Sequence, residues 1–461
     1  MEGSLESGGG RLNGEGWIDP SPEGNASFLF SASRYPLDAM VRFVPELRDK
    51  FRGGAIDLKG EIFLGSRAHW IALVRPRDVE VSRDVLGEAL RILSGDVVLT
   101  TGWGVVEGLE VEALGRRYGI TGRFRPEGPG FTVEARIRGQ DLNLDPWLFP
   151  APADSSVEEI SPGPSLRLKR WIEAFPSSRV DFDFGAVKFL DLLFQDLHGR
   201  LGTRDGRIVL EEAAGTLEGG EVAFEGSLDG DGEFWVGGGV DRAKAGAVFS
   251  ALGFQEELIE GPLHLQGGVS GQLKGKRAGR HRGLIELEVD KGVIRRFPLL
   301  ANILSLMNLT QILTGRLPDL SGEGMVFSKI KGSFTLLDGV ARTEDFRIYS
   351  EAMGFTMVGD IDVGRKACDL KVGVRPFVGF DRLVNQIPVI RHYLAGPEKS
   401  VFTTYFLVKG PLADPQVSAI PFRSLGEGMV GIFKRFLENP FQDLGIPYGL
   451  EAPPVDEPGS Q

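Results

Sequence analysis

Apolar and polar residues alternate along much of this chain, a two-residue period that predicts β-strands with one apolar face. The segment 131–138 is typical, because its odd-numbered residues are apolar and its even-numbered residues are polar or charged. The same alternation recurs at residues 180–184, 221–228 and 355–362. One apolar and one polar face is the pattern of an antiparallel sheet covered on one side only. Asp-Gly pairs such as 205–206, 229–230, 231–232 and 338–339 predict the hairpin turns between strands.

Five other segments repeat their apolar residues every three or four positions, which predicts amphipathic helices. These segments are residues 37–51, 245–258, 299–313, 377–394 and 422–437. Pro388 kinks or ends the fourth. The third either closes the end of a groove, touches a membrane or simply packs on the sheet. The fifth is either an interfacial membrane helix or a helix that docks on its own domain; its membrane-contact candidates are Phe422, Leu425, Met429, Phe433 and Phe436.

The first two helical segments belong to an internal repeat. When the sequence is slid along itself so that Met40 meets Ala247, Gly54 meets Gly261, and Ile56 and Leu58 meet residues 263 and 265. A helix, a glycine stop and an alternating strand therefore recur as one unit. Chance agreement in a glycine-rich chain is the alternative. A unit that cannot bury its own apolar face predicts an extended stack of such units.

Composition narrows the possible functions. Glycine supplies 64 of the 461 residues, about twice the usual share of roughly 7%, and turns account for much of the excess. The net charge of −12 gives no bulk attraction to nucleic acid. A single cysteine, Cys368, excludes an intrachain disulfide framework and a cysteine zinc cluster. Its thiol is expected to be structural.

The chain is expected to divide at its proline-rich stretches and basic loops. We predict a repetitive β region with one helix at residues 1–150, a linker at 151–165 and a second β-repeat region with a helix at 166–290. Residues 291–420 form a C-terminal domain, followed at 421–461 by the amphipathic helix and a disordered acidic, proline-rich tail.

Signs of catalysis or metal binding are nearly absent, so we expect no enzyme activity, no cofactor and no metal. The five histidines show no ligand spacing such as H-E-x-x-H. Asp181 and Asp183 share one strand face, as a glycosidase pair would, but solvated carboxylates are the expected interpretation. The basic loop 274–282 either meets anionic headgroups or is a solvated turn.

Residues 291–417 carry an ordered series of motifs that resembles the C-terminal region of the AsmA-like family, especially its YhdP/TamB-type envelope lipid-transfer proteins. The series consists of Lys291–Arg295, the apolar helix 300–309, Gly322–Phe327, Ile330–Phe334, Leu337–Phe346, Gly359–Asp362, Asp369–Val372 and Tyr405–Val417. Residues 1–290 resemble the family's repetitive β region in texture.

The resemblance implies an elongated, curled antiparallel β-groove, taco-like in section, with an apolar interior. It also implies transfer of phospholipid between the inner and outer membranes, a periplasmic location and association with the inner membrane. The family pattern begins with a transmembrane helix, and this chain departs from it, because Met1 leads into Glu2 and Gly3 with no basic and apolar run. Expected partners are phospholipid, a membrane surface and an inner-membrane anchor or upstream fragment; nucleic acid is not one of them.

A lipid conduit needs a continuous apolar face, and one-sided strands supply it. The candidates for contact with acyl chains are Phe131, Val133, Ile137, Val180, Phe182, Phe184, Val222, Phe224, Leu263, Leu265, Phe355, Met357 and Ile361. The same residues fit the filled core of a closed sandwich or barrel. Two further functions remain open: a scaffold that assembles outer-membrane proteins through exposed sheet edges, and a carbohydrate-active β-solenoid enzyme.

Overall fold

The computed structural model describes residues 2–7, 10–21, 24–40, 51, 53–82, 90–128, 130–148, 169, 171–251, 259–272, 281–295, 303, 324–350, 353–376, 404–412 and 414–421. Strands account for 79% of it, and the sheet structure is curled and not closed, which confirms the predicted β-groove class. The chain divides into unit 1, Met1–Glu256 with Pro262–Gly283, and unit 2, Glu257–Gly261 with Leu284–Gln461. The finer domain boundaries expected from the sequence stay a prediction.

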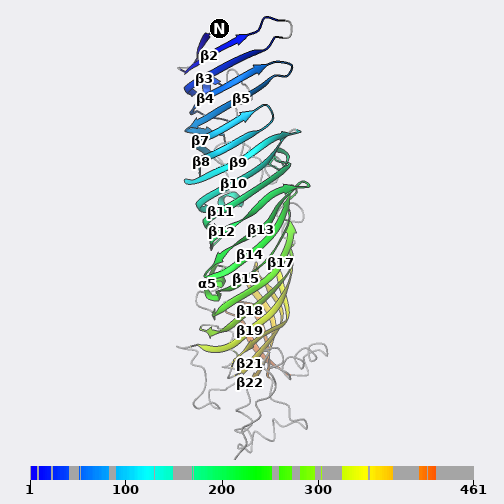
Figure 1. Ribbon diagram of the computed structural model, residues 1–461. Coiled ribbons are helices and arrows are strands. Elements are labelled where there is room, and N and C mark those ends of the chain that lie inside the picture. The colour runs from blue at the N-terminus through cyan, green and yellow to red at the C-terminus, as the bar shows by residue number, and fades with distance from the viewer. Residues whose placement is uncertain are drawn as a thin grey trace, which may run out of the picture. The chain divides into compact units, whose positions relative to one another are not determined.

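Unit 1 is a row of strands that pair in chain order (Figure 1). The strands are β1 (Glu2–Ser7), β2 (Gly10–Ile18), β3 (Ala26–Pro36), β4 (Ala55–Leu64), β5 (His69–Arg77), β6 (Val79–Val81), β7 (Leu90–Thr100), β8 (Gly104–Ala113), β9 (Arg116–Glu127), β10 (Gly130–Asn143), β11 (Ser177–Phe189), β12 (Leu192–Arg204), β13 (Arg207–Leu217), β14 (Gly220–Asp229), β15 (Glu233–Lys244) and β17 (Pro262–Gln272). The short β6 pairs with β7.

One pair departs from the antiparallel order that the sequence predicts. Strands β10 and β11 are parallel, with Thr132 opposite Ser177 and Asn143 opposite Lys188. The chain leaves β10 at one side of the row and enters β11 at the other, so the two strands are not joined as a hairpin would join them. The other pairings described within unit 1 are antiparallel.

Asp-Gly turns join several of these strands, as expected. Asp205 and Gly206 both have positive φ, 52° and 71°, and connect β12 to β13. Two positive φ values in succession define the type I′ turn, whose twist matches that of the flanking strands. Asp338 and Gly339, at 50° and 84°, make the same turn in unit 2.

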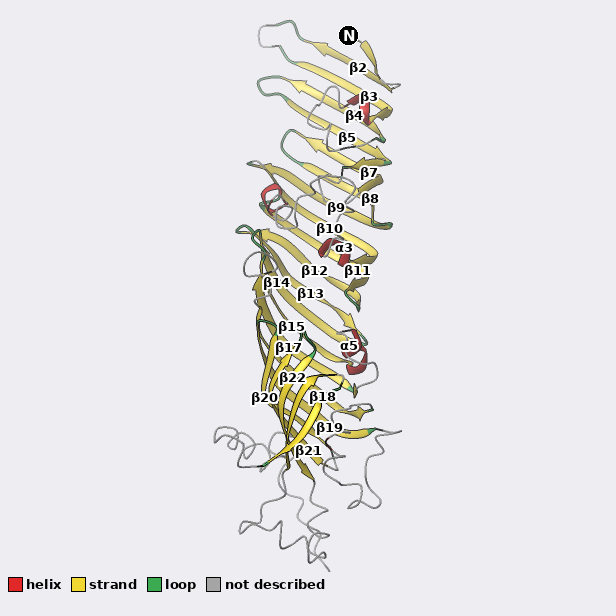
Figure 2. Ribbon diagram, turned by 180° about the vertical axis from the view of Figure 1, so that it is seen from behind, coloured by secondary structure: helices red, strands yellow, loops and turns green. Residues whose placement is uncertain are grey.

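Residues 171–174, which precede β11, are also helical. Three further helices in the described residues each follow directly after a strand of unit 1. They are α1 (Leu37–Met40), α3 (Asp145–Leu148) and α5 (Ala245–Ala251). Figure 2 shows all three along the same side of the row. We call this side the helix rim; it holds the strand ends at Pro36, Asn143 and Lys244. The strand ends on the other side of the row, such as Ile18, Leu64 and Gln272, form the opposite rim.

The predicted helices at 37–51 and 245–258 begin as α1 and α5, and their later residues other than Phe51 lie outside the described part. Phe51 forms an isolated β-bridge with Val81, so the first helix does not extend to it. The segments 377–394 and 422–437, including all five membrane-contact candidates, also lie outside it, as does the segment 299–313 apart from the buried, helical Ile303. The sequence repeat has a structural counterpart. A register shift at Arg34 precedes α1 and one at Arg242 precedes α5, and both residues have positive φ.

Cross-strand ion pairs cover the polar face of unit 1. Arg77 donates to Asp57 at 2.5 Å, and this guanidinium lowers the pKa of the Asp57 carboxyl. Arg75 does the same to Asp96 at 2.8 Å. Asp181, one member of the suspected carboxylate pair, binds Arg200 at 2.9 Å. The residues of this face are therefore solvated and paired.

Unit 2 contains a short pair and a six-strand meander. Its strands are β16 (Ile259–Glu260), β18 (His281–Ile294), β19 (Met325–Leu337), β20 (Val340–Tyr349), β21 (Met353–Asp362), β22 (Ala367–Pro376), β23 (Thr404–Pro411) and β24 (Gln416–Ile420). Strand β16 pairs with β18, and β19 to β24 pair in order.

The first half of β21 is buried on both faces, from Met353 through Val358. The sequence pattern predicted a polar outer face there, yet Thr356 is only 2% exposed. The hydroxyl of Thr356 was weak evidence that this position is exposed to solvent, because threonine is common in buried strands.

We predict that Cys368 resists alkylation in the folded protein. The residue is buried in β22 opposite Ile361 and Gly410, and burial raises the pKa of its thiol. Because the thiolate is the reactive form, reaction with iodoacetamide should be roughly a hundredfold slower than in denaturant. Mass spectrometry of timed samples measures the rate. Similar rates in buffer and denaturant would show that unit 2 is not packed as described.

Candidate functional site

An apolar face runs through unit 1 because the strands pair in register. In β9, β10 and β11, Ile120, Ile137 and Phe182 lie side by side. Tyr118 and Phe184 flank Gly139 on the same three strands, two residues nearer the helix rim. Their rings meet edge to face, with 6.1 Å between the ring centres. Neighbouring pairs thus place apolar side chains against apolar side chains. We call this surface the trough face.

The ten candidates that lie in unit 1 all belong to the trough face. Val180 is opposite Leu201, Val222 is opposite Val240, and Leu265 is opposite Val240 as well. Phe224 stands between Ala213 and Gly238. The remaining six are Phe131, Val133, Ile137, Phe182, Phe184 and Leu263. Their contact with lipid stays a prediction.

The trough face is longer than the sequence indicated. Strands β2 to β8 contribute residues that were not predicted: Ile18, Phe28, Phe30, Ile62, Leu64, Trp70, Val97 and Val106. Glycines interrupt their alternation, since Gly14, Gly16, Gly60 and Gly104 occupy inward positions. Each of these glycines stands where the two-residue period requires an inward, apolar residue. Counting them as inward positions would have extended the predicted apolar face to these strands.

Aromatic rings lie over several of these inward glycines. A methyl group at Gly104 would lie 2.3 Å from the ring of Phe124, and one at Gly60 would lie 2.3 Å from the ring of Phe30. Gly199 is covered in the same way by Phe182. The rings lie on the sheet instead of standing away from it, a packing that protects strand glycines. The face gains apolar area without filling the space above it.

The two rims of the trough differ in how they are covered. At the helix rim, one cluster packs Tyr35, Leu37, Ala39, Ile56 and Val79 against the chain around α1, and another packs Phe184, Val187, Leu197 and Ala213. Toward the opposite rim the same face is open. Trp70 is 38% exposed there and Phe131 is 42% exposed, whereas Val187 is 1% exposed. The trough is therefore lined by apolar groups that solvent or a ligand reaches from one side.

The three candidates in unit 2 have a different environment. Phe355 and Met357 are buried between β20 and β22, opposite Val374 and Val372. Ile361, opposite Cys368, is half-buried. Phe355 and Met357 thus belong to a filled core, and the open apolar surface among the candidates lies in unit 1.

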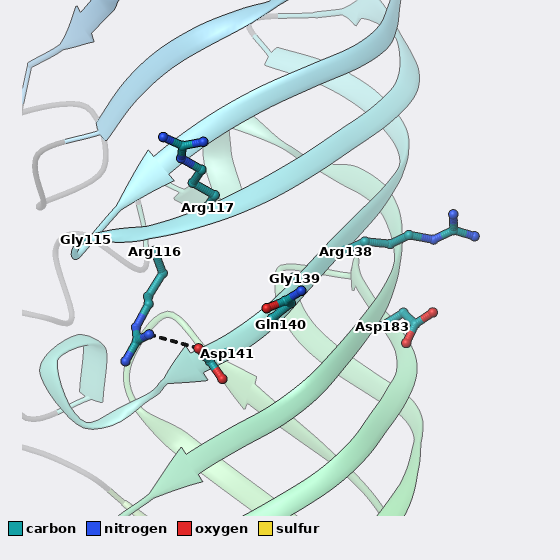
Figure 3. Close-up of a pocket in the computed structure, with 8 residues that line it drawn as sticks. All are labelled: Gly115, Arg116, Arg117, Arg138, Gly139, Gln140, Asp141 and Asp183. Atoms are coloured by element: carbon teal, nitrogen blue, oxygen red, sulfur yellow. Dashed lines mark hydrogen bonds and ion pairs between the residues drawn. The ribbon is translucent and has the colours of Figure 1, made fainter.

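A polar hollow of about 780 Å³ lies where β9, β10 and β11 meet. Figure 3 shows Arg116 reaching Asp141, at 2.9 Å, while Arg138 and Asp183 point away from that pair. The full lining is Gly115, Arg116, Arg117, Arg138, Gly139, Gln140, Asp141 and Asp183. The lining therefore carries three guanidinium groups and two carboxylates, of which Arg116 and Asp141 are paired. By strand alternation Arg138 and Asp183 lie on the face opposite Ile137 and Phe182, outside the trough.

Two further ion pairs lie among the described residues outside this hollow. His264 lies 2.6 Å from Asp241 on the polar face of β17 and β15. Lys329 binds Glu288 at 2.6 Å, and that contact raises the pKa of the lysine. In the described part of the chain, no three of the His, Cys, Asp and Glu side chains come close enough to hold a metal ion.

Residues 236–417 match the family model described as YhdP protein. The match begins within β15 and extends over the described strands of unit 2 into β24. No curated protein and no solved structure matches the chain. The family resemblance inferred from the C-terminal motifs is confirmed over this region.

We predict that Gly104→Ala destabilises the protein by about 1–3 kcal/mol, the usual cost of overpacking, because the new methyl group displaces the Phe124 ring. Gly119→Ala is the matched control: it lies on β9, and a methyl group added there would have no other atom within 4 Å. Thermal unfolding of both variants measures the difference. Equal stability of the two would show that the ring does not rest on Gly104.

Proposed function

Because residues 236–417 are a YhdP-type region, we propose that the protein is a bridge-type lipid-transfer module of the cell envelope. Phospholipid acyl chains lie along the trough face of unit 1 and move along it between the inner and outer membranes. The YhdP family is a bridge-like lipid-transport family associated with the envelope. The proposed role is binding and conduction, without a covalent step.

The observation that carries this proposal is an apolar face that is continuous in register yet open to one side. Soluble proteins rarely expose contiguous apolar surface beyond a few hundred Å². Ile62, Leu64 and Trp70 are all more than a third exposed on this face. Acyl chains would cover such surface and gain roughly 0.8 kcal/mol for each buried methylene.

The open rim also suits the amphipathic nature of a phospholipid. Burying a charged headgroup without partners is costly. A trough that covers the acyl chain and leaves one side open lets the headgroup remain in water. At about 4.8 Å between strands, a row of about fifteen strands extends unit 1 by roughly 70 Å, which is a substantial part of the distance between two membranes.

The proposed location is the periplasm, in association with the inner membrane through an anchor or upstream fragment. None of the helices in the described residues is long and apolar enough to cross a bilayer. The polar face, with its paired charges, keeps unit 1 hydrated on the side away from the trough. Phospholipid and a membrane surface are the proposed partners.

One observation favours the second candidate, a scaffold for outer-membrane proteins. Among the described residues β1 pairs only with β2, so its outer edge presents unpaired backbone groups. A free edge is able to accept a strand from another protein. In this role protein, not lipid, would be captured, and the trough face would remain uncovered by acyl chains.

We predict that photo-crosslinkers on the trough face capture phospholipid. Benzoyl-phenylalanine at Phe131 or Phe224 faces the trough, whereas the same group at the adjacent Thr132 or Glu225 faces away. Phe184 is a poorer position because it is only 7% exposed. After irradiation of cells, lipid adducts should appear at the first two positions and be roughly tenfold rarer at the controls. Equal labelling on both faces, or none, contradicts the proposal.

A charge in the trough should interrupt transport. We predict that Ile120→Asp lowers the amount of co-purified phospholipid and the rate of lipid transfer between vesicles by about tenfold or more, because a carboxylate is costly beside an acyl chain. Thr121→Asp, on the exposed face of the same strand, serves as control. Circular dichroism verifies that both variants fold. A normal transfer rate in the Ile120 variant would exclude this face as the path.

A further inference from the structure

The polar face of unit 1 carries several exposed apolar side chains at the opposite rim of β2 to β5. Trp17, Leu29 and Ile71 face away from the trough there, and each is about half exposed. Phe63 lies among them, and its ring centre is 4.8 Å from that of His69, with the two rings tilted by 33°. A trough for acyl chains requires apolar groups only on its inner face, so this outer patch needs a separate explanation.

The patch has two rows of side chains across the strands: Trp17 and Phe63 lie nearest the strand ends, and Leu29 and Ile71 lie in the next row. The second row also holds Glu15 and Glu61, which lie on either side of Leu29, and Lys59 lies beyond them. On β5 the apolar residues give way to Arg75, which binds Asp96. Trp17, Phe63 and Ile71 lie within two to three residues of a strand end, or about 7–10 Å at roughly 3.3 Å per residue, with Glu61 directly opposite Ile71.

On the inner face of the same strand ends, the trough itself is open. Ile18, Leu64 and Trp70 are exposed at this rim. Farther along unit 1 the opposite rim is covered instead: Ile172 is buried, and Thr203 donates a hydrogen bond to the carbonyl oxygen of Phe175. Lys169 binds Asp231 at 2.6 Å. The rim of β2 to β5 therefore carries apolar side chains on both faces, and the described residues place no such cover over it.

We propose that this rim, called the docking rim, seats in the interfacial layer of a phospholipid bilayer. The proposal rests on the proposed function, which it deepens by naming where lipids enter or leave the trough. A sheet that binds a protein partner needs only one apolar face. A sheet edge that inserts into the interfacial layer of a bilayer needs apolar side chains on both faces. The distance of about 7–10 Å from the strand ends agrees with the depth of roughly 5–10 Å reached by interfacial protein segments.

Tryptophan is the side chain that favours this layer, because its ring is apolar and its N–H remains polar. Trp17 and Trp70 occupy the outer and inner faces of the docking rim, and Trp103 is half exposed in the neighbouring turn between β7 and β8. A lipid that leaves the bilayer here passes from the interface to the trough face along Ile62 and Phe28 without crossing water.

Charge contributes little to this docking. In the described residues of the turns after β2, β4 and β7, the charged side chains are Asp19 and Arg67, one of each sign. The long stem of an arginine allows its charge to remain among headgroups. Binding driven by apolar burial should therefore depend weakly on salt and on anionic lipid.

Flotation of the full-length protein with vesicles tests the docking rim. The double variant Trp17→Ser/Ile71→Ser removes outer-face side chains and leaves the trough lining intact. Its partitioning onto phosphatidylcholine vesicles should fall roughly tenfold. The matched control Trp235→Ser/Leu193→Ser removes two exposed outer-face side chains elsewhere in unit 1 and should bind like the unchanged protein. Adding phosphatidylglycerol or high salt should change binding by less than about twofold.

Several results would overturn the inference: no flotation of the unchanged protein, equal loss in the control variant, or binding only to anionic vesicles. A change in sedimentation of the rim variant with no change in flotation would assign the rim to a second copy of the chain. Crosslinking at Phe224 separates the two proposals. If lipid adducts persist there while flotation fails, only the docking rim is wrong; if the adducts are missing, the proposed function fails first.

Discussion

The whole of unit 1 depends on one constraint, the agreement between a two-residue side-chain period and the hydrogen-bond register of neighbouring strands. A slip of one residue in any pair would turn every apolar side chain of the next strand to the polar face. The register is kept from β2 to β17, even across the parallel pair β10 and β11. Ile120, Ile137 and Phe182 are aligned for this reason.

An open sheet with one apolar face must cover that face or use it. Unit 1 does both. Its helix rim is covered by short helices and by chain segments that enter through register shifts such as those at Arg34 and Arg242, and residues there are fully buried. The opposite rim keeps Phe131 and Trp70 exposed. The asymmetry gives the trough one rim that holds the fold together and another that is open to a ligand at β2 to β5 and at Phe131.

Glycine contributes to this arrangement within the strands as well as in the turns. Inward glycines such as Gly60 and Gly104 let the rings of Phe30 and Phe124 lie against the sheet. A larger residue would force those rings to stand up into the trough. The high glycine content therefore serves an open interior as well as tight hairpins, whereas a core filled as in unit 2 places Phe355 and Met357 between strands without such space.

Local chemistry was enough to predict the strands, the Asp-Gly turns, the starts of α1 and α5 and the shared face of residues such as Phe182 and Phe224, because period and turn preference depend on neighbours in sequence. The sequence could not show the parallel pair, the exposed rim of β2 to β5 or the burial of Thr356. These depend on which strands meet and on what covers them. Burial is a property of contacts between distant segments, so only the tertiary structure decided that the apolar face is sealed at Met357 and open at Trp70.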